Sequence, residues 1–450
     1  MAITNLLVSL VFYNGAIQKI MQTTKIKIKK TVSRNPRKQY VSKKPIYEAT
    51  TVLHGEVNET SINYNQIGFK FAPFSKYRKL SPILKWPGGK EQELKHIAPN
   101  LPTAIRNYFE PFVGGGAVYT ALQAQKMFIN DRSDELINLY KMLASKNKTF
   151  FLALNEIAHN WNLLEKVTCD NQNYFIRLYK QYSADKIVFP TLSNFIYEFV
   201  LKNAEQFNGM FSPVFNFNIQ NFLKEINRNL VGKINRMKKI EKKRNTLPDN
   251  DILDNIETAL KSAFYMHFRH IYNNLKKYSV NKAFSAAIFL LIRNFAYSGM
   301  FRYNSKGEFN VPYGGIGYNR KDFAKKIHYL QSKELHQHLS KTVIENVDFE
   351  DFLERYMPTK GDFIFLDPPY DTEFSTYAKN DFTKDDQKRL ANYLINRCNA
   401  NWMLIIKHTD FISGLYNSNK LNIRPFSKKY LVSFMNRNDK NVEHLLITNY

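Results

Sequence analysis

Residues 107–123, NYFEPFVGGGAVYTALQ, combine three patterns that follow one another directly: an apolar strand, a run of three glycines and the start of a helix. Glycines at such a turn let the backbone approach a ligand closely and leave helix N–H groups pointing at it. A second apolar strand, MFIND, ends at Asp131. Alternating strands, turns and helices predict an α/β fold.

The same alternation of strands, turns and helices returns after about residue 340. FIFLDPPY at 363–370 is followed by a polar helix pattern near 383–397 and by the apolar strand WMLII at 402–406. Two β-rich runs, KKYLVSFM and VEHLLITNY, flank the polar connector NRNDKN and predict an antiparallel hairpin. We therefore expect one doubly wound sheet formed by residues 79–145 and 286–450.

Residues 146–285 lack this alternation and read as a mostly helical insertion between the two halves of the sheet. The stretch IETALKSAFYMHFRHIYNNLKKY has one apolar face with spacings of three and four residues. Its members are Leu260, Phe264, Phe268, Ile271 and Leu275.

The chain is strongly basic, with 65 Lys and Arg against 39 Asp and Glu and a formal net charge of +26. Such an excess indicates a polyanionic partner, with nucleic acid the first candidate and an anionic membrane surface the second. Residues 25–44, within an N-terminal extension at 1–78, carry nine basic and no acidic residues. This run is either an arm that faces nucleic acid or a disordered solubilising tail. Residues 224–245 carry nine Lys and Arg with two Glu, and we expect them to contact phosphates rather than only form a solvated helix face.

The cysteines and the N-terminus predict a cytoplasmic protein that does not enter a membrane. Cys169 and Cys398 are far apart and outside any CxxC spacing, so no disulfide framework is indicated. The apolar stretch at 6–13 is too short to span a bilayer. Histidine pairs at 267 and 270 and at 336 and 338 have no HExxH spacing, and we expect no metal site.

The cofactor motifs favour a nucleotide-like molecule without phosphates. The chain has no GxxxxGK[ST] sequence, and its glycines do not fit GxGxxG. Asp131, at a strand end after the glycines, can bind ribose hydroxyls of an adenosine-containing cofactor. The turn ILKWPGGK at 83–90 adds Trp86, which can lie against a flat or aliphatic group.

Four motifs in order carry a resemblance: KWPGGK, FEPFVGGG, FRYNSKGEFNVPYGG at 301–315 and DPPY. Together they resemble the alpha group of DNA adenine-N6 methyltransferases, the Dam-like type. The resemblance covers about residues 80–145 and 285–450. It implies a class I S-adenosylmethionine-dependent methyltransferase sheet, with the inserted helices as a DNA-recognition region.

The resemblance also implies a mechanism for the DPPY segment. In that family S-adenosylmethionine methylates the exocyclic amine of an adenine flipped out of the duplex. The Asp367 carboxylate and the Pro368 carbonyl would accept hydrogen bonds from the amine and localise its lone pair. The prolines fix the direction of the carbonyl. Tyr370 would stack on the extruded base.

The remaining site residues also follow from the resemblance. Those expected to contact the cofactor are Trp86, Lys90, Glu110, Gly114, Gly116, Asp131 and Asp367. Asp348 and Phe349, in ENVDFEDFL, would hold the edge of the target adenine together with Tyr370. The 301–315 segment reads as a hairpin whose tip contacts DNA. The tip residues are Arg302, Tyr303, Asn304 and Lys306.

We expect a monomeric, site-specific adenine methyltransferase acting on double-stranded DNA, as a solitary enzyme or beside a cognate restriction endonuclease. Two alternatives stay open at the level of sequence. The DPPY segment also suits N-methylation of RNA or of a glutamine amide. A catalytically silent DNA-binding regulator is the alternative from another class.

Overall fold

The computed structural model describes residues 80–212, 216–243, 246–317, 322–370, 382–429 and 441–450. These residues belong to one compact unit. The N-terminal extension at 1–78, with its basic run, lies outside the described residues.

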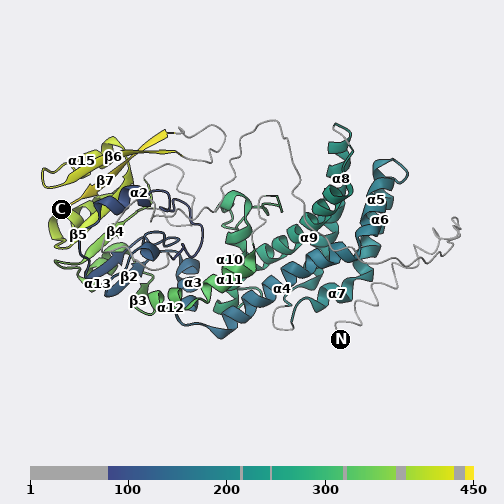
Figure 1. The fold of residues 1–450 in the computed structure, drawn as a ribbon, viewed down its shortest axis with the longest axis horizontal. Coiled ribbons are helices and arrows are strands. Elements are labelled where there is room, and N and C mark those ends of the chain that lie inside the picture. Colours follow the sequence, from purple (N-terminus) through teal and green to yellow (C-terminus); the bar gives the residue numbers. More distant parts are fainter. Residues whose placement is uncertain (1–79, 213–215, 244–245, 318–321, 371–381, 430–440) are drawn as a thin grey trace. The chain divides into compact units, whose positions relative to one another are not determined.

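A seven-stranded sheet forms the centre of the α/β part, in the order β3-β2-β1-β4-β5-β7-β6 (Figure 1). Strands β1 to β5 are parallel, whereas β7 runs antiparallel to both of its neighbours, β5 and β6. The strands are β1 Asn107–Glu110, β2 Lys126–Asn130, β3 Thr342–Glu345, β4 Phe363–Leu366, β5 Asn401–Lys407, β6 Asn422–Lys429 and β7 Asn441–Thr448.

Helices lie on both faces of this sheet because both faces of its strands are apolar. In β4, Phe363 and Phe365 pack into a cluster with the helices of the insertion. Their neighbours Ile364 and Leu366 point to the opposite face and join a second cluster with the helices that follow β3 and β4. The predicted doubly wound α/β class is confirmed.

The helices beside the sheet begin at residues that cap their first turns. Ser133 accepts a hydrogen bond from Leu136 N at the start of α3, and Thr383 and Asp386 form a capping box at α14. These helices are α2 Leu94–Ile97, α3 Asp134–Ala144, α11 Phe323–Leu330, α12 Lys333–Leu339, α13 Phe349–Tyr356, α14 Lys384–Asn392 and α15 Asp410–Leu415. Short 3₁₀ turns occur at Ala98–Asn100, Tyr119–Ala121 and Tyr297–Gly299, and a π turn at Tyr393–Arg397.

The region between α3 and the second half of the sheet is helical, as its sequence predicts. Its helices are α4 Lys148–Asp170, α5 Gln172–Ser183, α6 Phe189–Lys202, α7 Ala204–Gly209, α8 Ile219–Glu241, α9 Asp249–Tyr272 and α10 Lys282–Phe295. The predicted apolar face of α9 is buried from Leu260 to Ile271, but the helix ends at Tyr272, before Leu275. Helix α10 packs against α3, α4 and α9, and so joins the insertion to the sheet.

The C-terminal antiparallel strands are confirmed. In the described residues the first of them, β6, covers 422–429, so it begins before the predicted run 428–435. Most of that run, with the polar connector, falls at 430–440, outside the described residues. Within the described ranges no helix is long and apolar enough to cross a membrane.

Candidate active site

Three acidic side chains meet at the carboxyl ends of neighbouring strands. Glu110 is the last residue of β1, Asp131 follows β2 and Asp367 follows β4. Because β1 lies between β2 and β4, these strand ends are adjacent. The pKa of Glu110 is raised well above its usual value, first by burial and also by the negative charges of Asp367 and Asp131. Open α/β sheets bind their ligands at this edge.

Lys90 is ion-paired with Asp367, at the end of β4. Its Nζ lies 2.5 Å from Oδ2 of Asp367, donates to the Gly88 carbonyl at 2.8 Å and lies 3.1 Å from the Tyr370 hydroxyl. Burial by itself would lower the pKa of Lys90, but the charge of Asp367 and the nearby Tyr370 outweigh it and hold this pKa above the usual value. The Lys90 side chain is 3% exposed and that of Asp367 is 19% exposed. The site therefore holds a paired charge that solvent barely reaches.

The glycines after β1 leave room for the side chains of Trp86 and Tyr140, which pack directly against the backbone of this turn. A Cβ atom on Gly114 would lie 2.7 Å from Cδ1 of Trp86, and one on Gly116 would lie 2.5 Å from the Tyr140 hydroxyl. Both glycines have positive φ, which disfavours any other residue. The turn thus brings the backbone against the Trp86 loop.

Asp131 is fixed by the backbone that surrounds it. Its Oδ2 accepts from Gly114 N at 3.0 Å and its Oδ1 from Ser133 N at 2.9 Å. Burial raises the pKa of Asp131 to about 6, although these amide bonds act in the opposite direction. Asp131 is therefore held by the turns that follow β1 and β2, and its pKa is raised above the usual value.

Glu110 also has a partner within the chain. The Tyr108 hydroxyl donates to its Oε2 at 2.7 Å, and the side chain is 3% exposed. This buried pair keeps a carboxyl group between Asp131 and Asp367. Among the residues expected to contact the cofactor, the structure thus brings Glu110, Asp131 and Asp367 close together and pairs Lys90 with Asp367.

Comparison with known proteins identifies the family. The family model of D12 class N6 adenine-specific DNA methyltransferases matches residues 86–263 and 215–431. The chain belongs to this family.

Named relatives agree with this assignment over most of their length. The Type II methyltransferase M.MjaIII of Methanocaldococcus jannaschii is 26% identical over 390 residues, covering 83% of this chain and all of the relative. The Type II methyltransferase M.CviBI of Paramecium bursaria Chlorella virus NC1A is 26% identical, with 82% and 100% covered. The DNA adenine methylase of Vibrio cholerae is 28% identical, with 77% and 88% covered. The predicted family is confirmed, and the protein is an enzyme of the DNA adenine methyltransferase class.

Two further residues hold the DPPY segment of this methyltransferase. Gln387 of α14 is fully buried and donates from Nε2 to the Pro369 carbonyl at 2.9 Å. The ring of His444 in β7 makes an edge contact with Tyr370, with 5.4 Å between ring centroids. The sequence did not indicate either residue, because a Gln in a polar helix and a His in a strand acquire these roles only through tertiary contacts.

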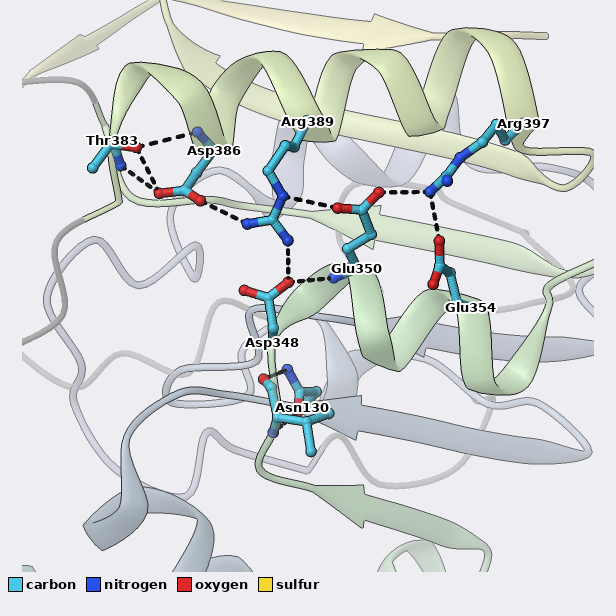
Figure 2. A network of polar contacts seen from close by, with 9 residues as sticks. Asn130, Asp348, Glu350, Glu354, Thr383, Asp386, Arg389 and Arg397 are labelled. Carbon is cyan, nitrogen blue, oxygen red and sulfur yellow. Dashed lines mark hydrogen bonds and ion pairs between the residues drawn. The ribbon is translucent and has the colours of Figure 1, made fainter.

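A polar network joins α14 to α13 (Figure 2). Arg389 of α14 donates to Asp348 at 2.6 Å and to Glu350 at 2.8 Å, and Arg397 reaches Glu350 and Glu354. Asp348 also accepts from Glu350 N at 3.0 Å as the cap of α13. The network fixes the helix that carries Gln387.

Asp348 and Phe349 lie at the start of α13. They follow β3, which two strands separate from β4, and neighbouring strands are about 4.8 Å apart. They are instead close to the end of β2, because the Asn346 amide donates to the Asp131 carbonyl at 2.8 Å. Phe349 is 2% exposed and its ring faces Phe112. These contacts place the two residues close to the end of β2, and their contact with the target adenine stays a prediction.

The 301–315 segment forms a turn with its tip at Asn304–Gly307. Asn304 N donates to the Glu308 carbonyl at 2.8 Å, and Tyr303 and Phe309 form a bridge. The Asn304 side chain is used within the turn, where its Oδ1 accepts from Lys306 N and Glu308 N.

Arg302 and Lys306 are exposed on this hairpin, but Tyr303 is not. The Tyr303 ring packs on Phe301 and Phe309, and its hydroxyl lies 3.2 Å from that of Tyr272. Of the four predicted tip residues, two therefore present their side chains to solvent.

Tyr297 is an aromatic residue near the hairpin that the sequence analysis passed over. It is 43% exposed and precedes Ser298 and Gly299, both with positive φ. The sequence signal for such a turn was Tyr-Ser-Gly at 297–299, one residue before the FRYN motif.

Proposed function

We propose that this methyltransferase transfers a methyl group from S-adenosylmethionine to the N6 amine of adenine at a specific sequence of double-stranded DNA, after flipping the base. The observation that carries the proposal is the braced segment Asp367–Tyr370 at the end of β4. Asp367 is ion-paired with Lys90, Pro369 is bonded by Gln387, and the family match covers the whole site.

The proposed work of Asp367 and Pro368 is to activate a poor nucleophile. The lone pair of the adenine amine is delocalised into the ring. Two fixed acceptors, the Asp367 carboxylate and the Pro368 carbonyl, would draw the amine hydrogens out of the ring plane. A carboxylate has about four acceptor positions, so the bond from Lys90 and a bond from the amine are compatible. Preorganised polar groups of this kind supply most of the rate enhancement in many enzymes.

The strand ends fit S-adenosylmethionine through the chemistry of their side chains. When bound, the cofactor supplies a methyl group activated by a sulfonium. Asp131 and Asp367 both lie close to the buried Glu110, and Asp367 is ion-paired with Lys90. Carboxyl groups at this edge suit a cationic ligand that also carries hydroxyls. Asp131 would accept hydrogen bonds from ribose hydroxyls.

The position of β3 revises one part of the site. Asp348 and Phe349 lie beside Asp131, at the end of the site that would hold adenosine. We assign them to the adenine of the cofactor instead of the target base. Trp86, whose loop lies against Gly114, would border the same ligand.

For the duplex, Tyr370 would stack on the flipped adenine, with Lys90 and His444 limiting its movement. Arg302 and Lys306 are the exposed basic residues of the hairpin and would contact the DNA. Arg302 is also held within the hairpin, because its Nε donates to Asn310 at 2.9 Å. Tyr297, exposed beside the hairpin, is better placed than Tyr303 to enter the stack as a wedge.

The decisive experiment is incubation of the purified protein with radiolabelled S-adenosylmethionine and, separately, duplex DNA, RNA and a protein mixture. We expect label only in DNA, and N6-methyladenine after digestion to nucleosides. Label in RNA or in glutamine would replace the proposal with the corresponding alternative. DNA binding without transfer would identify a silent regulator. Methylation-sensitive sequencing of DNA from cells that express the chain then gives the recognition sequence.

A second experiment tests flipping with 2-aminopurine at the target position. Tyr297→Ala should reduce the fluorescence increase on a matched duplex and much less on a mismatched one, where unpairing costs less. Arg302→Ala provides the comparison, since it should change affinity or base discrimination without selective rescue by a mismatch. Equal signals for wild type and Tyr297→Ala would remove the wedge from the proposal.

A further inference from the structure

Arg293, near the end of α10, bonds two segments that are far apart in the chain. Its Nη2 donates to the Lys85 carbonyl at 2.8 Å, in the loop that carries Trp86. Its Nη1 donates to the Met300 carbonyl at 2.9 Å, at the base of the 301–315 hairpin. One guanidinium thus joins the loop assigned to the cofactor to the hairpin assigned to DNA.

Aromatic contacts repeat this connection. The Arg293 guanidinium lies 4.4 Å from the ring centroid of Phe301 and 5.5 Å from that of Trp86. The two rings are 5.1 Å apart. A change in the hairpin that moves Phe301 therefore also moves the surroundings of Trp86.

A contribution to stability does not explain why a charged residue, Arg293, is buried at this position. Arg293 is 2% exposed, and within the described ranges it has no carboxylate partner and no acceptor for its Nε. Burial lowers the pKa of Arg293 to about 10, which still leaves it protonated at neutral pH. Burying a charge without a counter-charge is costly, and an apolar side chain could fill the same space. What arginine alone offers is a rigid fork whose donors reach two segments at once.

The base of the hairpin has a strained conformation that Arg293 holds. Ser298 and Gly299 have φ of 52° and 63°, and the left-handed region is unfavourable for serine. Nη2 of Arg293 also lies 3.4 Å from the Gly299 carbonyl. Strained turns persist where the surrounding structure fixes them and are frequent in segments that respond to ligands.

We propose that Arg293 is a positioning residue that couples the two substrates, so that DNA on the hairpin and cofactor at the Trp86 loop each raise the affinity for the other. Either ligand would order one of the two segments that Arg293 bonds, and the second ligand would then meet a segment already in place. The coupling is reciprocal by thermodynamic linkage. This inference rests on the proposed function, since it requires binding of both substrates.

The coupling is measured by calorimetry of S-adenosylhomocysteine, with and without a saturating duplex library of random sequence. For the wild type we expect the duplex to raise the affinity about 5-fold or more, within the usual range of allosteric coupling. Arg293→Met should bring this ratio close to one. Arg293→Lys keeps the buried charge but not the fork, and should also lower the ratio. The lysine variant serves as the test if the methionine variant does not fold.

Arg269 gives a matched control within the same hairpin. It belongs to α9, and its Nη1 donates to the Val311 carbonyl at 3.0 Å. Arg269→Met should weaken DNA binding but leave the ratio at its wild-type value, because it removes a hairpin bond without touching the Lys85 segment.

Three outcomes would overturn the inference. The first is a wild-type protein that binds both ligands with a ratio of one, which leaves the proposed function intact. The second is a wild-type ratio in folded Arg293 variants. The third is an equal loss in the Arg269 and Arg293 variants, which would assign the effect to general loosening of the hairpin. Wild-type protein that binds neither ligand would overturn the proposed function as well.

Discussion

The carboxyl edge of the sheet and the outer face of α8 both concentrate charge, but in opposite ways. At the edge, Lys90 and Asp367 are largely buried and paired at 2.5 Å. On α8, Lys224, Arg236 and Lys239 are exposed, and the Arg228 side chain is 70% exposed. One region fixes its charges before any ligand arrives, while the other presents them to solvent.

The difference separates the two tasks of a DNA methyltransferase. Buried charges at fixed distances act on a reacting group and are little affected by salt. Exposed charges attract phosphates over a longer range and are screened. Lys238 shows that the distinction applies residue by residue, because it lies in the same basic run as its exposed neighbours but is buried and ion-paired with Asp185 at 2.5 Å.

The largest effect is expected at the edge of the sheet. Asp367→Ala removes one of two proposed acceptors and should lower the single-turnover methylation rate by at least about 10²- to 10³-fold. Asp385→Ala is the control, since that side chain is 84% exposed and pairs only with Lys388 among the described ion pairs. A variant at Asp367 that keeps more than about a tenth of the rate would contradict the clamp.

On the α8 side, we expect the triple change Lys224→Ala, Arg236→Ala and Lys239→Ala to act through salt dependence. Each lost phosphate contact lowers the slope of log affinity against log salt by about one. If all three contacts are lost, the fall in DNA affinity between about 50 and 200 mM salt should be roughly 40-fold smaller in the triple variant than in the wild type. Lys166→Ala, an exposed lysine on α4, should leave the slope unchanged. An unaltered slope in the triple variant would place DNA elsewhere.

Asp131 sharpens the comparison through pH, because burial raises its pKa to about 6. Ribose binding needs the carboxylate, so affinity for S-adenosylhomocysteine should fall about tenfold from pH 7 to pH 5. Asp131→Asn should bind S-adenosylhomocysteine weakly, and its affinity should not depend on pH in this range.

The same carboxyl group also affects stability, because its usual pKa of 3.8 lies below its pKa in the folded protein. The folded state therefore binds the proton more tightly, and this group's contribution to stability is lost as pH rises through 6. Titration calorimetry across pH measures the change in ligand affinity, and scanning calorimetry across pH measures the change in stability.

The smallest effect is expected at Gln387. Gln387→Leu removes one neutral hydrogen bond to the Pro369 carbonyl, which should lower kcat about 5-fold, equivalent to about 1 kcal/mol. Cofactor affinity should not change. Lys388→Leu, on the adjacent exposed position of α14, is the control. A loss confined to cofactor affinity would mean that Gln387 supports a different part of the site.

Short-range patterns made most of the fold predictable. FIFL before DPPY indicates a strand that ends at an acid, and the glycines indicate the turn after β1. The start of β6 was missed because residues 422–429, NIRPFSKK, contain a proline and several polar residues, which are disfavoured in strands.

The site was less predictable wherever roles depend on distant contacts. Gln387 and Arg293 bond carbonyls 18 and 208 residues away, and no local pattern indicates either contact. Tyr303 was placed at the tip although Phe301, two residues earlier, shares its face of the strand. That alternation was readable and would have predicted that Tyr303 packs inward.

The insertion also determines the order in which the catalytic sheet can be completed during synthesis. Strand β1 pairs with β4, and the bond between Asn107 and Asp362 beside them spans 255 residues. On the ribosome, β1 and β2 therefore emerge long before their partners β3 and β4. The helices from α4 to α10 contact mostly one another and can fold in this interval. Once folded, these helices shorten the effective distance between the two halves of the sheet. They would thereby favour the pairing of β3 with β2 and of β4 with β1.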